Sequence, residues 1–144
     1  MAFESLREGL LDEFGKLAEL KSDREVHIRI PGLVWPVRVQ FNFGDYYDES
    51  LVIGNLVRVS ARVATVSNWQ QEGVARRLLR SDDSMMGRFV RNGDTATYEY
   101  YSGLPGLELD ALTACVEHVA LAAVRTNIDL RAAKDARKIA GGTV

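Results

Sequence analysis

Hydrophobic residues near the start of the chain recur every three or four positions, which is the spacing of one side of an α-helix. Acidic and other polar residues fill most of the positions between them. The pattern predicts an amphipathic helix, weakened by Gly9 and Gly15, each of which costs roughly 1 kcal/mol relative to alanine. Such a helix depends on packing its hydrophobic stripe, which consists of Phe3, Leu6, Leu10, Phe14 and Leu17.

Hydrophobic and polar residues then alternate in three successive runs, the pattern of half-buried β-strands. The first run begins at Glu25 and stops at Pro31-Gly32, and the second covers Val37 to Phe43. The polar stretch 44–50 is predicted to be a loop. A third strand is expected over roughly residues 51–66, with a break or bulge near Gly54-Asn55.

The second half of the chain predicts a helix, a hairpin and a longer helix. A capping-box pattern at Ser67–Gln70, serine followed three residues later by glutamine, marks the start of a short helix. Strands are expected around 86–91 and over 95–101, joined by Asn92-Gly93, a strong signal for a tight hairpin turn. A long helix is predicted over about residues 109–136. The order is α-β-β-β-α-β-β-α, an α+β fold with a twisted antiparallel sheet and its helices on one side.

Composition limits the class of protein. The chain has 144 residues, 47% hydrophobic and 26% charged, which is typical of a globular protein, so we predict one domain over residues 1–144. The formal net charge of −2 disfavours nucleic acid and anionic membranes as partners. No segment approaches the roughly 20 hydrophobic residues of a membrane helix, and the first residues lack a secretory-signal pattern. Cys115 is the single cysteine and cannot form an internal disulfide, which indicates a reducing, cytoplasmic location.

Several features of the second half occur in a characteristic order. A Leu-Leu helix end is followed by a polar link, a Gly-Arg-Phe strand, an Asn-Gly turn, an aromatic strand, a Leu-Pro corner and a leucine-rich helix. In this sequence the parts are Leu78-Leu79, Gly87-Arg88-Phe89, Asn92-Gly93, Tyr98 to Tyr101, Leu104-Pro105, and Leu107 with Leu112. With them, residues 78–120 resemble the second half of the YbjN-like family, whose fold is that of type III secretion chaperones.

This resemblance has implications for function. It implies a helix-backed, twisted antiparallel sheet and no enzymatic activity. In secretion chaperones it implies a bacterial cytoplasmic homodimer that wraps an extended, partly unfolded client segment. In the YbjN-like family it implies a sensory or stress regulator.

No motif indicates a catalytic residue, a cofactor or a metal. The corner Gly103–Gly106 lacks the spacing of a phosphate-binding loop and is predicted to join a strand to the last helix. His27 and His118 lie on different elements, without further ligands at metal-binding spacing, and are predicted to be surface residues. Cys115 lies on the core side of the last helix and is interpreted as a small buried hydrophobic residue. Solvated loops, not calcium sites, are predicted for Asp45, Asp48 and Glu49 and for Asp82-Asp83.

The last helix is hydrophobic on two sides. One side carries the residues expected to face the core, and nearly opposite it lie Leu121, Val124 and Ile128. A second hydrophobic stripe needs a partner surface. A homodimer contact is the favoured explanation, and packing against the first helix or binding of a client are the alternatives.

The polar side of the predicted sheet is rich in arginine. If the alternation holds, the arginines there are candidate client-binding residues, together with Trp69, which falls off the hydrophobic side of its own helix. A solvated sheet surface is the simplest interpretation, contact with an acidic peptide is the second, and nucleic acid is disfavoured because few aromatic residues lie among them. The arginines are Arg29, Arg38, Arg58 and Arg62.

These observations favour a non-enzymatic, chaperone-like or adaptor protein that binds an extended polypeptide client as a homodimer. Binding would use the sheet or its open edge, where main-chain hydrogen bonds supply affinity and side-chain pockets supply selectivity. The alternative is a regulatory or sensory domain with a small-ligand pocket between the sheet and the helices. A buried cavity would favour the regulator, and a flat apolar strip beside an unpaired strand edge would favour the client-binding protein.

Overall fold

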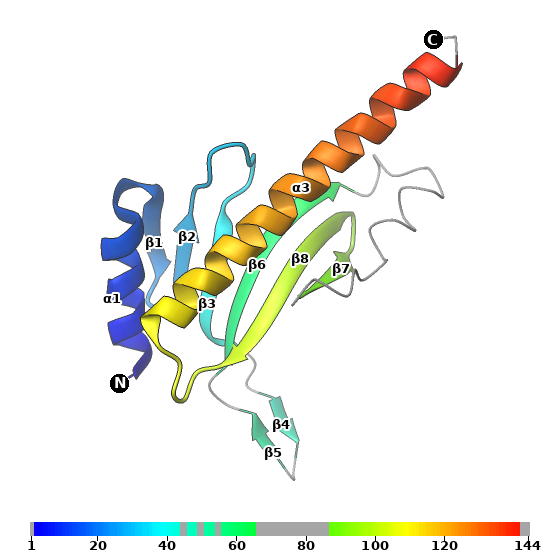
Figure 1. Ribbon diagram of the computed structural model, residues 1–144. Coiled ribbons are helices and arrows are strands. Elements are labelled where there is room, and N and C mark those ends of the chain that lie inside the picture. Colours follow the sequence, from blue (N-terminus) through cyan, green and yellow to red (C-terminus); the bar gives the residue numbers. More distant parts are fainter. Residues whose placement is uncertain (1, 44–45, 49–50, 54–55, 66–86, 142–144) are drawn as a thin grey trace.

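The structure, a computed structural model, describes residues 2–43, 46–48, 51–53, 56–65 and 87–141. Two α-helices and eight strands are assigned among them (Figure 1). In chain order the elements are α1 (Ala2–Phe14), the 3-10 turn η1 (Gly15–Leu17), β1 (Ala18–Ser22), β2 (Glu25–Ile28), β3 (Val37–Phe43), β4 (Tyr46–Asp48), β5 (Leu51–Ile53), β6 (Leu56–Thr65), β7 (Arg88–Asn92), β8 (Thr95–Gly103) and α3 (Leu109–Gly141).

Six of the strands form one sheet, in the order β1-β2-β3-β6-β8-β7, and every neighbouring pair in it is antiparallel. The remaining two, β4 and β5, pair with each other and project from one end of the sheet as a small hairpin (Figure 1). The predicted α+β class with an antiparallel sheet is confirmed. The helix predicted to start at Ser67–Gln70 lies outside the described residues.

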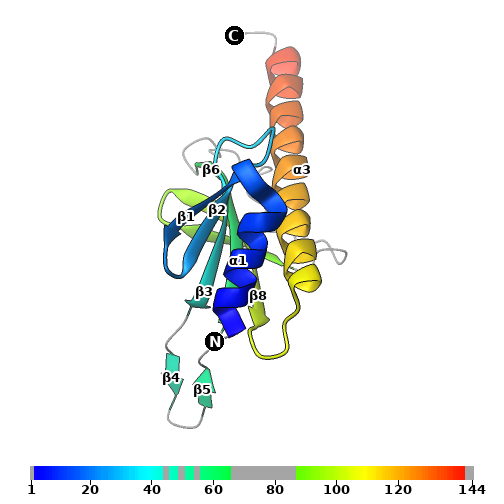
Figure 2. The same ribbon diagram turned by 90° about the vertical axis from the view of Figure 1, so that its left-hand side faces the viewer.

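Both described helices cover the same face of the six-stranded sheet (Figure 2). Alternate residues of the strands point to that face, and hydrophobic residues of α1 and α3 pack on them in one continuous core. For these two helices, the arrangement confirms the predicted placement on one side of the sheet. The fully buried side chains of α3 that face the sheet are Leu112, Val116, Val119 and Ala123.

The first helix is shorter than predicted. It ends at Phe14, and Gly15 adopts a φ of 54°, a left-handed conformation that glycine tolerates best and that stops a helix. The stretch after it forms β1, which the helical pattern did not predict and which pairs with β2 through Ala18 and Ile28. Leu17, assigned to the helical stripe, is consequently exposed.

The region after β3 also differs from the prediction. The expected loop 44–50 contains β4, and the expected third strand is two strands, β5 and β6, which belong to different sheets. Tyr46 pairs with Ile53 in the small hairpin, and aromatic and β-branched residues of this kind favour strands. The glycine, acidic and serine residues of stretch 44–50 led to the prediction of a loop, although its two tyrosines favour a strand.

The hairpin and the corner after it form as expected. Asn92 of β7 pairs with Thr95 of β8 around the predicted turn. Leu104 is buried in the core, and its carbonyl accepts a hydrogen bond from the Leu107 amide at 3.1 Å, so the corner is a turn that leads into α3. The last helix begins at Leu109 as predicted and continues to Gly141, well beyond the sheet (Figure 1). No helix in the described part of the chain has the length and hydropathy needed to cross a membrane.

Candidate functional site: the polar face of the sheet

The face of the sheet opposite α1 and α3, called here the polar face, carries charged and hydroxyl side chains. One row crosses five strands through the pairs His27–Arg38, Arg38–Ser60, Ser60–Glu99 and Glu99–Arg88. Cross-strand neighbours on one face have Cβ atoms roughly 5 Å apart, so each of these side chains lies next to the following one in the row. Ser60, which is almost fully buried, stands at the middle of the row, with Arg38 on one side of it and Glu99 on the other.

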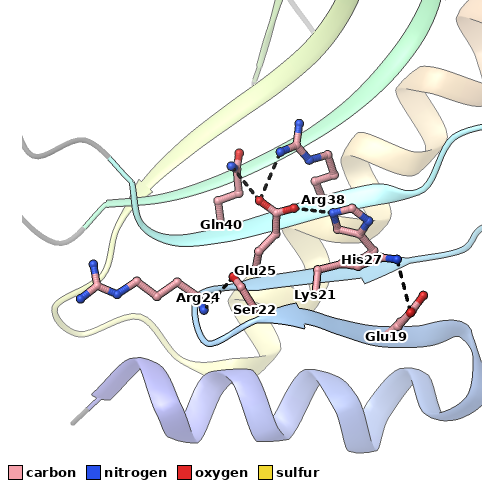
Figure 3. A network of polar contacts seen from close by, with 8 residues as sticks. All are labelled: Glu19, Lys21, Ser22, Arg24, Glu25, His27, Arg38 and Gln40. Atoms are coloured by element: carbon pink, nitrogen blue, oxygen red, sulfur yellow. Dashed lines mark hydrogen bonds and ion pairs between the residues drawn. The ribbon is translucent and has the colours of Figure 1, made fainter.

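Glu25 organises one side of this face (Figure 3). Its two carboxylate oxygens bind three neighbours: Nε2 of His27 at 2.5 Å, Nη2 of Arg38 at 3.2 Å and Nε2 of Gln40 at 3.0 Å. Burial by itself would raise the pKa of Glu25, but the hydrogen bonds and charges of His27 and Arg38 outweigh it and lower the pKa below its usual value. Glu25 is therefore a carboxylate that fixes the positions of its partners.

Glu99 has the same role on the other side. Its side chain is only 3% exposed, and its oxygens lie 2.9 Å from Nη2 of Arg58 and 3.5 Å from Nη2 of Arg88. A carboxylate this deeply buried requires such partners. The pKa of the nearby Tyr101 is raised, by burial and by the Glu99 charge, so its hydroxyl stays protonated. Arg58 is therefore held in place as Arg38 is by Glu25.

Between these two carboxylates lies a pocket of about 330 Å³, called here the arginine pocket. The ring of Trp35 forms one wall, with the guanidinium carbon of Arg62 5.5 Å from the ring centroid, a cation–π distance. Glu25 and Glu99 are not part of the lining. The lining residues are His27, Trp35, Pro36, Arg38, Arg58, Ser60, Arg62, Thr95 and Thr97.

A second pocket, of about 670 Å³, adjoins the first toward β1 and is called here the apolar pocket. Two of its hydrophobic residues are strongly exposed, Leu17 at 38% and Val34 at 78%. It shares His27 and Pro36 with the arginine pocket, so the two pockets adjoin on the polar face, and together they are called here the groove. The lining residues are Leu17, Glu19, Lys21, His27, Arg29, Ile30, Pro31, Gly32, Leu33, Val34 and Pro36.

The structure brings three of the four candidate arginines together. Arg38, Arg58 and Arg62 line the arginine pocket, whereas Arg29 lies in the apolar pocket and donates a hydrogen bond to the Lys16 carbonyl at 3.4 Å. Trp69, the candidate anchor, lies outside the described residues.

Sequence reasoning missed Trp35, the tryptophan of this site. Trp35 precedes Pro36, just before the predicted strand, and no motif in the sequence marks it as a site residue. The signal that could have indicated it is a large aromatic residue in the short connection between two predicted strands that carry arginines.

The structure describes two of the three side chains of the second hydrophobic stripe of α3. Leu121 is 50% exposed between the exposed Glu117 and Arg125, and Val124 is half-buried. Ile128 belongs to the helix, but its side chain is not among those described. Packing against α1 does not account for Leu121, because that side chain remains half exposed with α1 in place.

The histidines and the cysteine lie in partly buried positions. Both histidines are half-buried, not surface residues: His27 binds Glu25 within the sheet, and Nε2 of His118 lies 2.9 Å from the Tyr98 hydroxyl. Cys115 packs against the core from a partly buried position, and burial raises the pKa of its thiol. Within the described residues, no group of three or more potential metal ligands is present.

Most of the acidic residues considered as calcium ligands lie outside the described residues. Asp48 belongs to β4, but its side chain is not described, and the others lie outside the described residues: Asp45, Glu49, Asp82 and Asp83.

One solved structure similar to this chain is the type III secretion chaperone SycH of Yersinia pestis, determined in complex with a stable fragment of YscM2. The superposition has a TM-score of 0.54 at 16% sequence identity, and it covers 86% of this chain and 98% of that chain. No protein-family model matches the chain, and no curated protein does. The chain therefore has a secretion-chaperone-like fold.

Proposed function

We propose that this protein is a non-enzymatic, chaperone-like or adaptor protein that binds an extended polypeptide client as a homodimer. The observation that carries the proposal is the fold likeness to SycH, a secretion chaperone whose structure contains a bound protein fragment. The resemblance of residues 78–120 to the YbjN-like family supports the same fold. We further propose a cytoplasmic location, in keeping with the single cysteine.

The groove on the polar face is the proposed client site. It spans two adjoining pockets, of which one is lined mostly by hydrophobic side chains and the other holds three arginines. An extended segment can place alternate side chains in such a groove. The outermost strands of the described sheet, β1 and β7, offer a further route, the addition of a client strand through main-chain hydrogen bonds.

The proposed homodimer uses the second stripe of α3. Leu121 is the large hydrophobic side chain exposed on that helix within the described side chains, and dimer contacts commonly bury such residues. The C-terminal part of α3 extends beyond the described sheet (Figure 1).

A regulatory domain that binds a small anionic ligand is the second candidate. The arginine pocket favours it, since about 330 Å³ is the lower end of the usual range for small-molecule sites. Its position differs from the expected one, because the pocket lies on the polar face and not between the sheet and the helices.

Selection from a random library of displayed peptides, followed by fluorescence anisotropy with the selected peptides, tests the proposal. We expect saturable binding that weakens about tenfold or more in Val34→Asp, which places a charge in the apolar pocket. Leu20→Asp is the matched control, because the Leu20 side chain is also exposed but lines neither pocket, and its replacement leaves the main-chain groups of β1 in place. Failure of every peptide to bind, with stabilisation by a small organic anion instead, would favour the regulatory domain.

A further inference from the structure

We infer that the bound segment carries an acidic side chain and a hydrophobic side chain on the same side of an extended chain. The carboxylate enters the arginine pocket, and the hydrophobic side chain enters the apolar pocket. This inference rests on the proposed function and specifies the chemistry of the client.

The arginine pocket has an excess of positive charge, which favours a carboxylate as its ligand. Two of its arginines form ion pairs: Arg38 with Glu25, and Arg58 with Glu99. Arg62 has the Trp35 ring beside it and, among the described residues, no carboxylate. The pocket is therefore positively charged beyond what the two glutamates offset, and an incoming carboxylate supplies the missing negative charge.

The pocket also offers hydrogen-bond donors that a carboxylate can satisfy. Nε of Arg38 is a buried donor without a hydrogen-bond partner among the described residues. A buried donor of this kind costs free energy until an acceptor reaches it. A carboxylate has two oxygens, each with two lone pairs, and accepts readily from guanidinium groups and from the hydroxyl groups on β6 and β8 that line the pocket.

The arginines are also held in place before a ligand arrives. Glu25 binds Arg38 and His27, Glu99 binds Arg58, and Trp35 supports Arg62. Because these contacts already restrict the long arginine side chains, less rotational entropy is lost when an anion binds. A surface arginine without such support would gain far less from the same ion pair.

The remainder of the groove distinguishes a peptide from a nucleic acid. Most of the apolar pocket is lined by hydrophobic residues, proline and glycine; among its charged residues Lys21 is paired with Glu19 at 3.3 Å, and Arg29 donates a hydrogen bond to the Lys16 carbonyl. The single aromatic ring of the arginine pocket already carries Arg62 on its face. Single-stranded nucleic acids need a continuous basic groove with open aromatic platforms, so an acidic and hydrophobic peptide fits better.

The alternation of an extended chain sets the spacing. Side chains on the same side of a strand belong to residues i and i+2, which lie about 6.6 Å apart. We therefore expect the acidic and hydrophobic residues of the client to be separated by an even number of positions.

The test uses fluorescent peptides of serine, threonine and glutamine that carry one leucine and one glutamate two or four positions apart. Anisotropy is measured with the full chain. Exchange of the glutamate for glutamine should weaken binding about tenfold, and exchange of the leucine for serine should weaken it similarly. In Arg62→Gln the preference for the glutamate peptide over the glutamine peptide should become smaller, because the arginine without a glutamate partner is gone while Arg38 and Arg58 remain. Arg91→Gln is the control, since Arg91 is an exposed arginine outside the groove that contacts the Gly93 carbonyl.

The outcomes separate this inference from the proposed function. Equal binding of the glutamate and glutamine peptides to the wild-type protein overturns the inference and leaves the proposed function standing. Tighter binding of a lysine peptide or of a phosphoserine peptide overturns the carboxylate assignment in the same way. If no peptide of any composition binds, both the inference and the proposed function are wrong.

Discussion

The hydroxyl of Tyr98 lies 2.9 Å from Nε2 of His118, and this contact joins β8 to α3. Tyr98 is fully buried, and its ring lies against Phe89 at a centroid distance of 5.0 Å. The same hydroxyl accepts a hydrogen bond from the Gly87 amide at 2.8 Å. One phenol therefore connects the start of β7, the strand β8 and the last helix.

Removal of that hydroxyl should destabilise the protein. Tyr98→Phe keeps the ring and loses both hydrogen bonds, and we expect the free energy of unfolding to fall by about 1–3 kcal/mol. Urea denaturation monitored by circular dichroism measures the change. Tyr100→Phe is the control, because Tyr100 is half-buried on the same strand and its hydroxyl has no hydrogen-bond partner among the described residues. Equal stability of the two variants would contradict the assignment.

Gly87 is required for the close approach of the chain to β8. A Cβ atom at this position would lie 2.5 Å from the Glu99 carbonyl oxygen and 2.8 Å from Cζ of Tyr98. We expect Gly87→Ala to lower the free energy of unfolding by about 1–3 kcal/mol, since backbone must move to make room. At Gly103 an added Cβ meets nothing within 4 Å, so Gly103→Ala should change stability by less than about 0.5 kcal/mol. The same urea titration compares the two, and a larger loss in Gly103→Ala would refute the explanation.

The periodicity of the sequence predicted the fold class because alternation survives wherever one sheet face is buried. Val37 and Val39 are fully buried, while Arg38 between them lies on the polar face. The pattern failed at β1, since Leu17 and Leu20 continue the helical spacing of α1 although they follow the left-handed Gly15. A short edge strand of this kind is specified by its pairing with β2, which local spacing does not contain.

The candidate site was predictable only in part. Alternation placed Arg38 and Arg58 on the polar face, but it could not show that Glu25 and Glu99 hold them, because those ion pairs join different strands. The role of Trp35 depends on the return of β6 beside β3, a relationship set by sheet topology.

The pH dependence of stability should reveal the Glu25 network. Because the folded state lowers the pKa of Glu25, the ionised carboxylate stabilises the fold above its unfolded pKa, and this contribution is lost as the pH falls through the lower, folded pKa. Glu25→Gln should therefore be less stable than wild type by about 1 kcal/mol at pH 7. The difference should shrink as the pH is lowered from 7 to about 3.5.

Glu19→Gln is the matched control for this measurement. Glu19 lies on the neighbouring strand, mostly exposed, and pairs with Lys21 at 3.3 Å (Figure 3). An exposed pair of this kind contributes little, so the variant should follow the wild-type stability at every pH. A difference for Glu25→Gln that stays constant with pH would show that its cause is lost packing, not lost charge.

The proposed dimer makes a prediction about molecular mass. We expect the wild-type protein to have the mass of a dimer in light scattering, and Leu121→Asp to shift it toward the monomer by raising the dissociation constant about tenfold or more. The reason is that a carboxylate at the centre of a hydrophobic contact must be desolvated without a partner. Leu20→Asp should leave the mass unchanged, because Leu20 is about as exposed as Leu121 but lies on the edge strand β1, away from α3. A wild-type protein that is already monomeric at high concentration would show that the exposed side of α3 has another function, and client binding would then be the next explanation to test.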